Sequence, residues 1–392
     1  VVGHGPVRHR RGRGEVDVPN KQRAREQFER FEPRLREFSR WMYGNPVSAC
    51  EEYVTSRGAV VILSEAGFTV EYPAYGLETA FVARAGSAGP EVIVCAEMDA
   101  LPEVGHACGH NIICNAGLGA GIAVAPIAED LGIRITVLGT PAEEHRGGKV
   151  DLIEAGAFEG AAASMMIHPS TMDTVDIQAL AIKHIDVEFF GKEAHASSAP
   201  HAGINALDAA VQAYVNVSML RQRILDTDRL HGVITHGGSA PNVIPDRTSM
   251  SWYVRSVTAE RLDVLYPLVM ACFEAAAQAT GCTFEVTPSG HAYTDMRNDT
   301  LLATLFQRNS EVLGRPMPWS RDTDKEGAGS TDMGNVSYEV PAIHPMLGIN
   351  AGGASTHQRD FAAHTITEDG MRAIRDGALA MAGTIIDLAE GD

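Results

Sequence analysis

Residues 96–115 read A-E-M-D-A-L-P-E-V-G-H-A-C-G-H-N-I-I-C-N and combine carboxylates, thiols and imidazoles in one short stretch. The stretch follows an apolar run, Val92–Cys95, that predicts a buried strand ending in a loop. In that loop Cys108 and His110 stand two residues apart, and Asp99 precedes them. A thiolate and an imidazole at this spacing can converge on one metal ion. The stretch therefore predicts one wall of a metal site.

Two adjacent acids, Glu143 and Glu144, follow the apolar run 133–138 and a Thr-Pro turn. One carboxylate there could bind a metal ion while its neighbour takes a proton from a metal-bound water. The alternative is a solvated loop or a helix N-terminus, where the helix dipole favours acids. Spacing alone leaves both interpretations open.

His168 ends the apolar run 161–167. Taken alone, such a histidine is more often structural than a ligand, and Cys108 alone would be a small buried hydrophobe. The set favours a site, because its members fall on loops after successive strands, and such loops converge at one edge of an α/β sheet. The set comprises Cys108, His110, Glu143, Glu144 and His168.

A further histidine could close this cluster, and the C-terminal part of the chain offers three. His357 lies in A-S-T-H-Q-R-D-F, after a Gly-rich stretch, and could reach the site. His344 and His364 compete with it, and spacing excludes neither.

Strands and helices must position these residues, and they alternate along the chain up to about residue 182. Helices are predicted over 21–42, 48–65, 117–131 and 150–155, and strands over 68–72, 79–84, 92–95, 133–138 and 161–167. This alternation indicates an α/β fold, with an open mixed sheet flanked by helices and a site at the strand ends.

A different order follows: strand 185–190, helix 203–225, strands 232–235 and 248–256, helix 259–279 and strand 283–286. It predicts a ferredoxin-like α+β domain inserted into the first. The chain then returns through helix 300–313, strand 342–347 and helix 368–388. We therefore expect a flexible N-terminal arm over 1–20, a catalytic domain of 21–182 and 295–392, and an inserted domain of 183–294.

Composition excludes several classes of function. The 392 residues carry a net charge of -18, which argues against nucleic acid as a partner. No apolar run reaches the roughly 18 residues that a membrane helix needs, so no membrane is expected. The six scattered cysteines favour free thiols in a reducing cytoplasm. The basic N-terminus has no apolar core and is not a secretory signal.

Two loops of the inserted domain also hold polar residues. G-K-E-A-H-A-S-S-A-P-H carries His195 and His201, and Gly237-Gly238 precede Asn242. From the residues alone, turn formation is the favoured interpretation of both loops.

Together these motifs resemble the two-metal family of glutamate carboxypeptidases, aminoacylases and hippurate hydrolases. They are most similar to its branch of auxin-conjugate and aminobenzoyl-glutamate amidohydrolases and dipeptidases. The resemblance covers nearly the whole chain after the arm. It rests on A-E-M-D-A-L-P, G-H-A-C-G-H, P-A-E-E, His168-Pro169, G-K-E-A-H-A, N-A-L-D-A, P-N-V-I-P-D and S-T-D-M-G-N-V-S, in this order.

The resemblance implies two divalent ions in the catalytic domain and a lid domain that mediates homodimerisation. By position, the metal ligands would be Cys108, His110, Glu144, His168 and His357. Glu143 would be the general base, and Asp99 would support the ligands. His195 would reach the substrate from the lid, often in the partner subunit's site. Asn242 and Arg255 would also meet the substrate, while His106 is expected to be a bystander.

Two positions depart from the family pattern. Asn111 stands where many auxin-conjugate hydrolases have Asp, which leaves the substrate open. Glu97 stands where more distant relatives place a metal-binding histidine. The use of Cys108 as a ligand goes with that second replacement, so we interpret it as specific to the branch.

The expected function is metal-dependent hydrolysis of a small amide with a free carboxylate: an N-acyl amino acid, an aminobenzoyl-glutamate-like compound or a dipeptide. Two ions, Zn²⁺ or Mn²⁺, would activate a water, Glu143 would take its proton, and His195 would stabilise the oxyanion. A catalytically inactive metal- or ligand-binding protein on the same fold is the alternative. A thiol hydrolase that uses Cys108 with a histidine would leave the paired glutamates idle.

Overall fold

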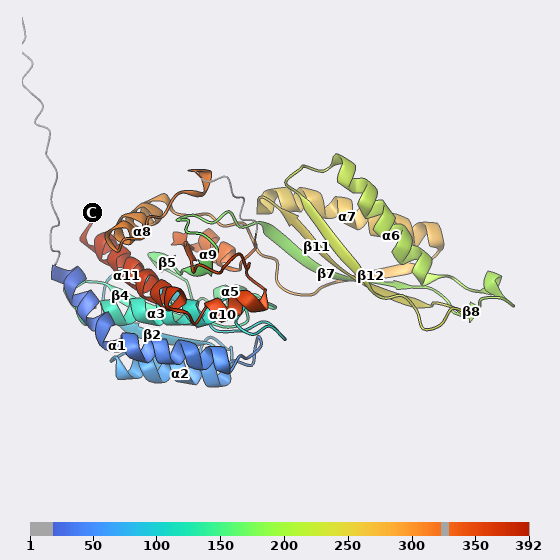
Figure 1. Cartoon of the computed structure of the whole chain (residues 1–392). Helices are drawn as coiled ribbons and strands as arrows, with labels where there is room; N and C mark the ends of the chain where they lie inside the picture. The colour runs from blue at the N-terminus through green and yellow to red at the C-terminus, as the bar shows by residue number, and fades with distance from the viewer. Residues whose placement is uncertain (1–18, 323–328, 392) are drawn as a thin grey trace, which may run out of the picture.

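The computed structural model describes residues 19–322 and 329–391, and the arm predicted over 1–20 falls almost wholly outside them. The chain forms two lobes (Figure 1). The large lobe holds a mixed sheet between two layers of helices. The small lobe, residues 181–288, extends away from it as a four-stranded sheet covered by two helices.

The sheet of the large lobe has six strands in the order β1-β2-β4-β3-β5-β13. Their bounds are β1 Thr69–Glu71, β2 Phe81–Ala85, β3 Glu91–Glu97, β4 Arg134–Thr140, β5 Ala163–Met165 and β13 Ala342–Ile343. Four strands, from β4 to β13, run parallel, and β1 and β2 are antiparallel to their neighbours. The predicted open mixed sheet is confirmed.

Both faces of this sheet are buried, as the alternation of side chains along β3 shows. Val92 and Val94 pack into one apolar core, whereas Ile93 and Cys95 pack into a second one. The first core lies under α1 Pro19–Gly44, α2 Tyr53–Glu65, α3 His110–Val124, α8 Thr300–Val312 and α11 Glu368–Glu390. The second lies under α5 Gly148–Glu154 and α9 Met333–Glu339.

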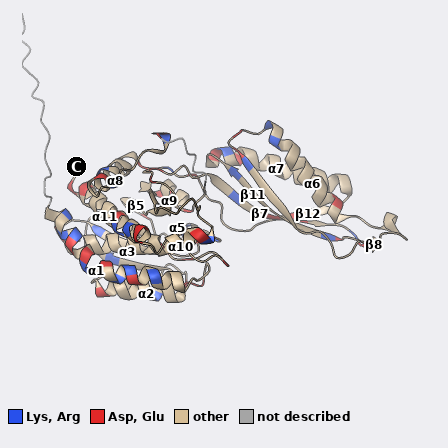
Figure 2. Cartoon of the chain, in the orientation of Figure 1, with Lys and Arg blue, Asp and Glu red and all other residues tan. Residues whose placement is uncertain are grey.

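Helix α3 is the centre of the lobe, because all of its residues are buried. Its small residues let it approach the sheet closely: a Cβ on Gly117 would lie 2.8 Å from the backbone oxygen of Cys95. It continues through a 3-10 turn, Ala125–Ile127, into α4 Ala128–Leu131. Charged side chains of both signs lie on the outer helices (Figure 2) and form ion pairs, such as Arg36 with Glu368 and Arg375 with Glu29.

The small lobe has the ferredoxin-like order that was predicted. Its sheet runs β12-β7-β11-β9, antiparallel throughout, with β7 Ala181–Phe190, β9 Arg229–His236, β11 Arg247–Ser256 and β12 Thr283–Pro288. Helices α6 Ala206–Leu220 and α7 Ala259–Thr280 cover one face around the buried Trp252. At the tip farthest from the large lobe, β8 Ala194–His195 pairs with β10 Val243–Ile244 (Figure 1).

Several predicted bounds were wrong, and two of them change the position of site residues. The helix predicted from 117 begins at His110, because Gly109 adopts a left-handed conformation (φ 82°) that turns the chain into α3. The strand predicted over 342–347 is broken at His344-Pro345, since proline lacks the N–H that a ladder needs. Its second half, β14 Met346–Gly348, pairs with β6 His168–Ser170.

Two segments have the length and composition of a membrane-spanning helix, His110–Leu131 and α7. In the first, 89% of the relevant window is buried inside the protein. In α7, Leu265, Val269 and Phe273 are buried in the core of the small lobe. Packing in the folded protein therefore accounts for the apolar character of the first segment, whereas only 33% of the window in α7 is buried.

Candidate metal centre

The residues predicted to bind metal lie together at the carboxyl edge of the large sheet. Cys108 comes from the loop after β3, His110 begins α3, Glu144 follows β4 and His168 begins β6. Their donor atoms form two groups whose members lie within 4.8 Å of one another: Cys108 with His110 and His168, and Cys108 with Glu144 and His357. Cys108 belongs to both groups, so the two candidate sites lie next to each other.

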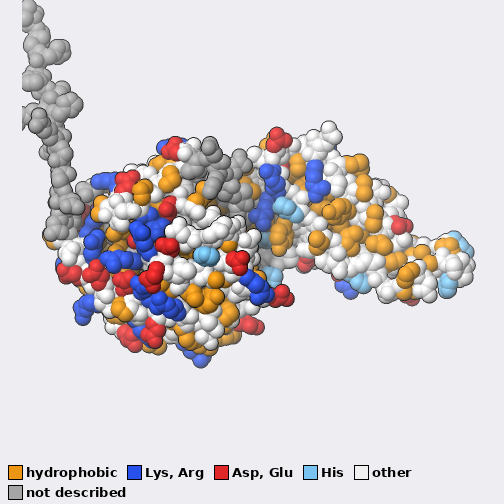
Figure 3. Space-filling view, viewed as in Figure 1, with side chains coloured by type: hydrophobic (Ala, Val, Ile, Leu, Met, Phe, Trp, Pro, Cys, Tyr) orange, Lys and Arg blue, Asp and Glu red, His pale blue; other side chains and the backbone are white. Residues whose placement is uncertain are grey.

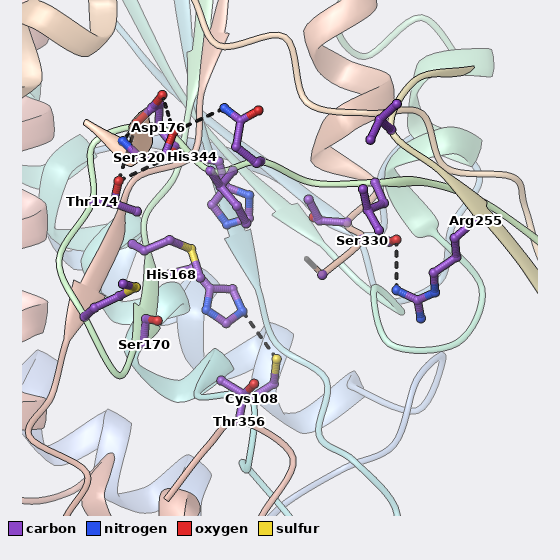
Figure 4. Close-up of a pocket in the computed structure, with 18 of the residues that line it drawn as sticks. Cys108, His168, Ser170, Thr174, Asp176, Arg255, Ser320, Ser330, His344 and Thr356 are labelled. Carbon is purple, nitrogen blue, oxygen red and sulfur yellow. Dashed lines mark hydrogen bonds between the residues drawn. The ribbon is translucent and has the colours of Figure 1, made fainter. Parts of the chain in front are cut away.

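The shortest contact of the first group joins the Cys108 Sγ and the His168 Nε2 at 3.3 Å (Figure 4). In the second group, His357 Nε2 lies 3.6 Å from Glu144 Oε2, and the His357 side chain is 57% exposed. His357 has a positive φ of 70°, and its backbone N–H donates to the Ala107 oxygen at 2.8 Å. Its loop is thus tied to the Cys108 loop across the sequence.

Neighbouring groups orient these ligands. Asp99, which is 1% exposed, hydrogen-bonds His110 Nδ1 at 3.0 Å and accepts the Glu144 backbone N–H at 3.0 Å. His168 Nδ1 donates to the Pro169 oxygen at 2.7 Å. Both imidazoles therefore turn their Nε2 toward the cluster, as metal-binding histidines do. Asp99 thus contacts both His110 and Glu144.

The turn between Cys108 and His110 depends on glycine. Gly109 has φ 82°, and a Cβ there would lie 2.3 Å from the Pro169 Cγ. Only a glycine allows the loop to pass this close to β6. The same contact brings Cys108 next to His168.

Burial and charge set the protonation of the acids and bases. Burial, together with the Glu97 and Glu144 carboxylates, raises the pKa of Glu143 well above its usual value. Burial lowers the pKa of His168 to about 4, so its imidazole is neutral. Burial also opposes the charged form of His110, but the Asp99 and Glu97 carboxylates outweigh it and hold that pKa well above 6.5.

The cluster has the donors of a metal site and lacks internal partners for them. Among the buried atoms that have no hydrogen-bond partner within the described residues are His110 Nε2, Glu144 Oε1 and Glu97 Oε2. An unpaired buried polar atom is costly, so a ligand is expected there. Thiolate, imidazole and carboxylate donors fit Zn²⁺ and also accept Mn²⁺. The residues present therefore fit two divalent ions.

Buried residues next to the cluster were not assigned a role from the sequence. Lys149 is 0% exposed, and its Nζ bonds Glu97 Oε1 and, at 2.7 Å, Asp332 Oδ1. Two features of the sequence could have indicated that Glu97 and Lys149 are buried. Glu97 ends the apolar strand V-I-V-C-A-E, and Lys149 stands at the start of the short apolar helix α5.

The competing histidines take different positions. His344 is 1% exposed, and its ring lies 5.5 Å from that of His168 in the same pocket wall. His364 is exposed on α10 Arg359–His364, where its Nδ1 donates to the Asp360 oxygen. His106 is buried outside the metal-holding groups, and burial lowers its pKa to about 3.

A pocket of about 900 Å³ opens over the cluster and extends to the small lobe. Cys108, Glu143 and His168 lie in its wall, and Arg255 of β11 enters from the small lobe (Figure 4). The structure does not bring His195 or Asn242 to this pocket. Both are exposed at the tip of the small lobe, where β8 pairs with β10.

Comparisons with known proteins agree with this architecture. Residues 181–280 match the family model of the peptidase dimerisation domain (M20). The chain is 38% identical over 385 residues to the Xaa-Arg dipeptidase of Mus musculus, covering 94% of this chain and 88% of that one. It is 26% identical to a subunit of the p-aminobenzoyl-glutamate hydrolase of Escherichia coli, covering 88% of this chain and 87% of that one.

Among solved structures, the YXEP protein of Bacillus subtilis, described as a dinuclear metal-binding peptidase of the M20 family, has a similar fold. The TM-score is 0.71 at 21% identity, over 92% of this chain and 99% of that one. The sequence identity to the dipeptidase, over nearly the whole length of both chains, carries the assignment. The chain belongs to the M20 family of metallopeptidases and is a metal-dependent peptidase or amidohydrolase.

Proposed function

We propose that this enzyme is a dipeptidase that removes a C-terminal basic residue with a free carboxylate, with Glu143 as general base. The observation that carries the proposal is the charge arrangement of the 900 Å³ pocket. A carboxylate, Asp176, and a guanidinium, Arg255, lie on opposite sides of it (Figure 4), with Glu143 in the wall; Arg229 and Arg321 also line the pocket.

Arg255 supports recognition of the substrate carboxylate. Its Nη1 donates to the Ser330 Oγ at 3.2 Å, and its buried Nε has no hydrogen-bond partner within the described residues. Burial lowers the pKa of Arg255. In the described part of the chain, no carboxylate oxygen lies within 4.0 Å of its guanidinium nitrogens, so Arg255 forms no ion pair there. A half-buried guanidinium with free donors is suited to bind a carboxylate in bidentate fashion.

Asp176 supports a basic side chain at the other end of the pocket. It is 9% exposed and accepts hydrogen bonds from the Ser320 backbone N–H at 2.6 Å and the Ser320 Oγ at 2.9 Å. These bonds hold the carboxylate in the pocket wall, and no cation of the described residues pairs with it within 4.0 Å. The names of the mouse and human relatives, both Xaa-Arg dipeptidases, favour the same substrate class.

Glu143 is placed to move a proton. Its side chain lies in the pocket wall, and its backbone oxygen accepts the Tyr293 hydroxyl at 2.7 Å, which fixes its loop. Two divalent ions in the cluster would supply Lewis acidity that lowers the pKa of a water and polarises the scissile carbonyl. Glu143 would take the proton of the attacking water and pass it to the leaving nitrogen.

The remaining lid residues would act across a homodimer. His195 lies in β8, at the tip of the small lobe away from the large lobe (Figure 1), and the Asn242 oxygen accepts the backbone N–H of the next residue, Ala196. In our proposal they enter the partner's site, where His195 stabilises the oxyanion. Apolar side chains gather on the exposed face of the small lobe (Figure 3), among them Val211, Val215 and Met219 of α6. We propose the cytoplasm as its location, since all six cysteines are free.

The test is a substrate panel with purified enzyme and added Mn²⁺ or Zn²⁺. Dipeptides ending in Arg, Lys, Leu and Glu, N-acyl amino acids and aminobenzoyl-glutamate are compared by the amino acid released. Release of Arg or Lys at the highest kcat/KM is expected. Preferred release of Glu or Leu would contradict the basic specificity, and no turnover with metal bound would favour the inactive binding protein.

Variants of the two pocket charges sharpen that test. Asp176→Asn should lower kcat/KM for the Arg dipeptide by at least tenfold, because a hydrogen bond to a charged group is worth about 1.5–3 kcal/mol. The same variant should leave the Leu dipeptide nearly unchanged. Asp263→Asn, at an exposed ion pair of α7, is the matched control. Equal losses for both dipeptides would contradict the role of Asp176.

A further inference from the structure

The Glu97 carboxylate ends strand β3 directly beneath the metal cluster and is 1% exposed. Its Oε1 accepts from the Lys149 Nζ, which also bonds Asp332. Two acids therefore share one ammonium, and the His110 imidazole lies on the other side of Glu97.

The second oxygen of Glu97 points at the cluster. Glu97 Oε2 lies 3.3 Å from His110 Nε2, and neither atom has a hydrogen-bond partner in the described part of the chain. The other His110 nitrogen is already engaged by Asp99. The distances from His110 Nε2 to Glu144 Oε1 and Glu143 Oε2 are longer, 3.7 and 3.9 Å. Glu97 is thus the carboxylate nearest to the free nitrogen of His110.

This spacing suits two ligands of one ion. Metal bonds of about 2.0–2.1 Å at a tetrahedral angle separate two donor atoms by about 3.3–3.4 Å. The donor atoms of Glu97, His110 and Glu143 also lie within 4.8 Å of one another, as a third group that could hold a metal. All three residues of this group are buried.

We propose that Glu97 is a sixth protein ligand, which binds the same ion as His110 from the buried side of the site. Lys149 and Asp332 are positioning residues, since they hold Glu97 Oε1 and leave Oε2 free. Glu97 would thereby add a buried carboxylate donor beside His110. This inference rests on the proposed metal-dependent function.

The first test measures metal binding without catalysis. The protein is stripped with a chelator, and the stoichiometry and affinity for Co²⁺ and Zn²⁺ are measured by elemental analysis and by competition with a chromophoric chelator. Glu97→Gln should weaken one of the two sites at least tenfold and change the d–d spectrum of bound Co²⁺. Asp228→Asn, which alters a buried carboxylate paired with Arg261 in the small lobe, should leave affinity and spectrum unchanged.

The outcomes separate this inference from the function on which it rests. Two sites of unchanged affinity and spectrum in Glu97→Gln would overturn the ligand role and leave the proposed function standing. A wild-type protein that binds no metal would overturn the proposed function itself. If Glu97→Gln does not fold, a metal-loaded crystal structure of the wild type decides. An Oε2–metal distance of about 2.0–2.2 Å is expected, and a separation above about 3 Å would refute the inference.

Discussion

Replacing Lys149 with methionine should destabilise the large lobe far more than the loss of a surface lysine would. The Lys149 side chain is 0% exposed and its partners Glu97 and Asp332 are 1% and 0% exposed. Lys149→Met keeps much of the side-chain volume but leaves two buried carboxylates without their cation. Breaking a buried ion pair in this way costs about 3–5 kcal/mol. Two lost charge-assisted hydrogen bonds, at about 1.5–3 kcal/mol each, give a similar sum.

The assay is urea unfolding of the metal-free protein, because bound ions would add their own stabilisation. Hydrogen exchange of the β3 and β4 amides reports the large lobe separately from the lid. Lys183→Met is the control, since Lys183 and Asp263 form an ion pair whose side chains are 29% and 72% exposed. That variant should lose no more than about 1 kcal/mol.

The difference in unfolding free energy between wild type and Lys149→Met should depend on pH, because Glu97 titrates. Burial raises its pKa, but Lys149 and His110 outweigh this and lower the pKa to about 2, below the usual value of 4.5. The stabilisation is therefore fully present above pH 4.5 and is lost as the pH falls toward 2. The free-energy difference between wild type and Lys149→Met should shrink in that window. A loss below about 1 kcal/mol at pH 7, or a difference that grows in acid, would refute the reasoning.

Three further predictions concern the site, the dimer and the thiols. Glu143→Gln should lower kcat by about 10²–10⁴-fold with metal content unchanged by elemental analysis, and near-wild-type turnover would remove Glu143 as the base. His195→Ala and Glu143→Gln subunits, each inactive alone, should regain activity when mixed, because the mixed dimer has one intact site; no recovery in isolated mixed dimers would place His195 outside the partner's site. Alkylation of the native protein at pH 8 should label Cys50, which is exposed, and spare Cys95 and Cys114, because burial raises their pKa to about 12. Labelling of either buried thiol, detected by mass spectrometry, would contradict the buried environment.

The ordering of strands and helices was readable from the sequence because both domains follow strong periodic patterns. Candidate site residues could be proposed because they follow strands whose ends meet at one edge, as Cys108 and Glu144 do. The predicted bounds of the helices and strands that carry these residues were less accurate than their order. The start of α3 at His110 depends on the left-handed Gly109, which packs against Pro169, 60 residues away in sequence.

Contacts between distant segments could not be predicted in this way. The Lys149–Glu97–Asp332 group joins a helix, a strand end and a loop, and only the fold brings them together. Asn111 illustrates the same limit, since its position suggested a link to the substrate. Its side chain instead donates to Ser39 and Thr365, which lie in the helical layer.

The central claim is that Cys108 and its neighbours bind two ions on which peptide hydrolysis depends. The most direct measurement is a titration of chelator-stripped enzyme with Mn²⁺ or Zn²⁺ while release of arginine from a dipeptide is followed. The stripped enzyme should be inactive, turnover should reach its maximum at two ions per chain, and Cys108→Ala should bind fewer ions and stay inactive. Full activity of the stripped protein, or unchanged metal binding in Cys108→Ala, would contradict the account.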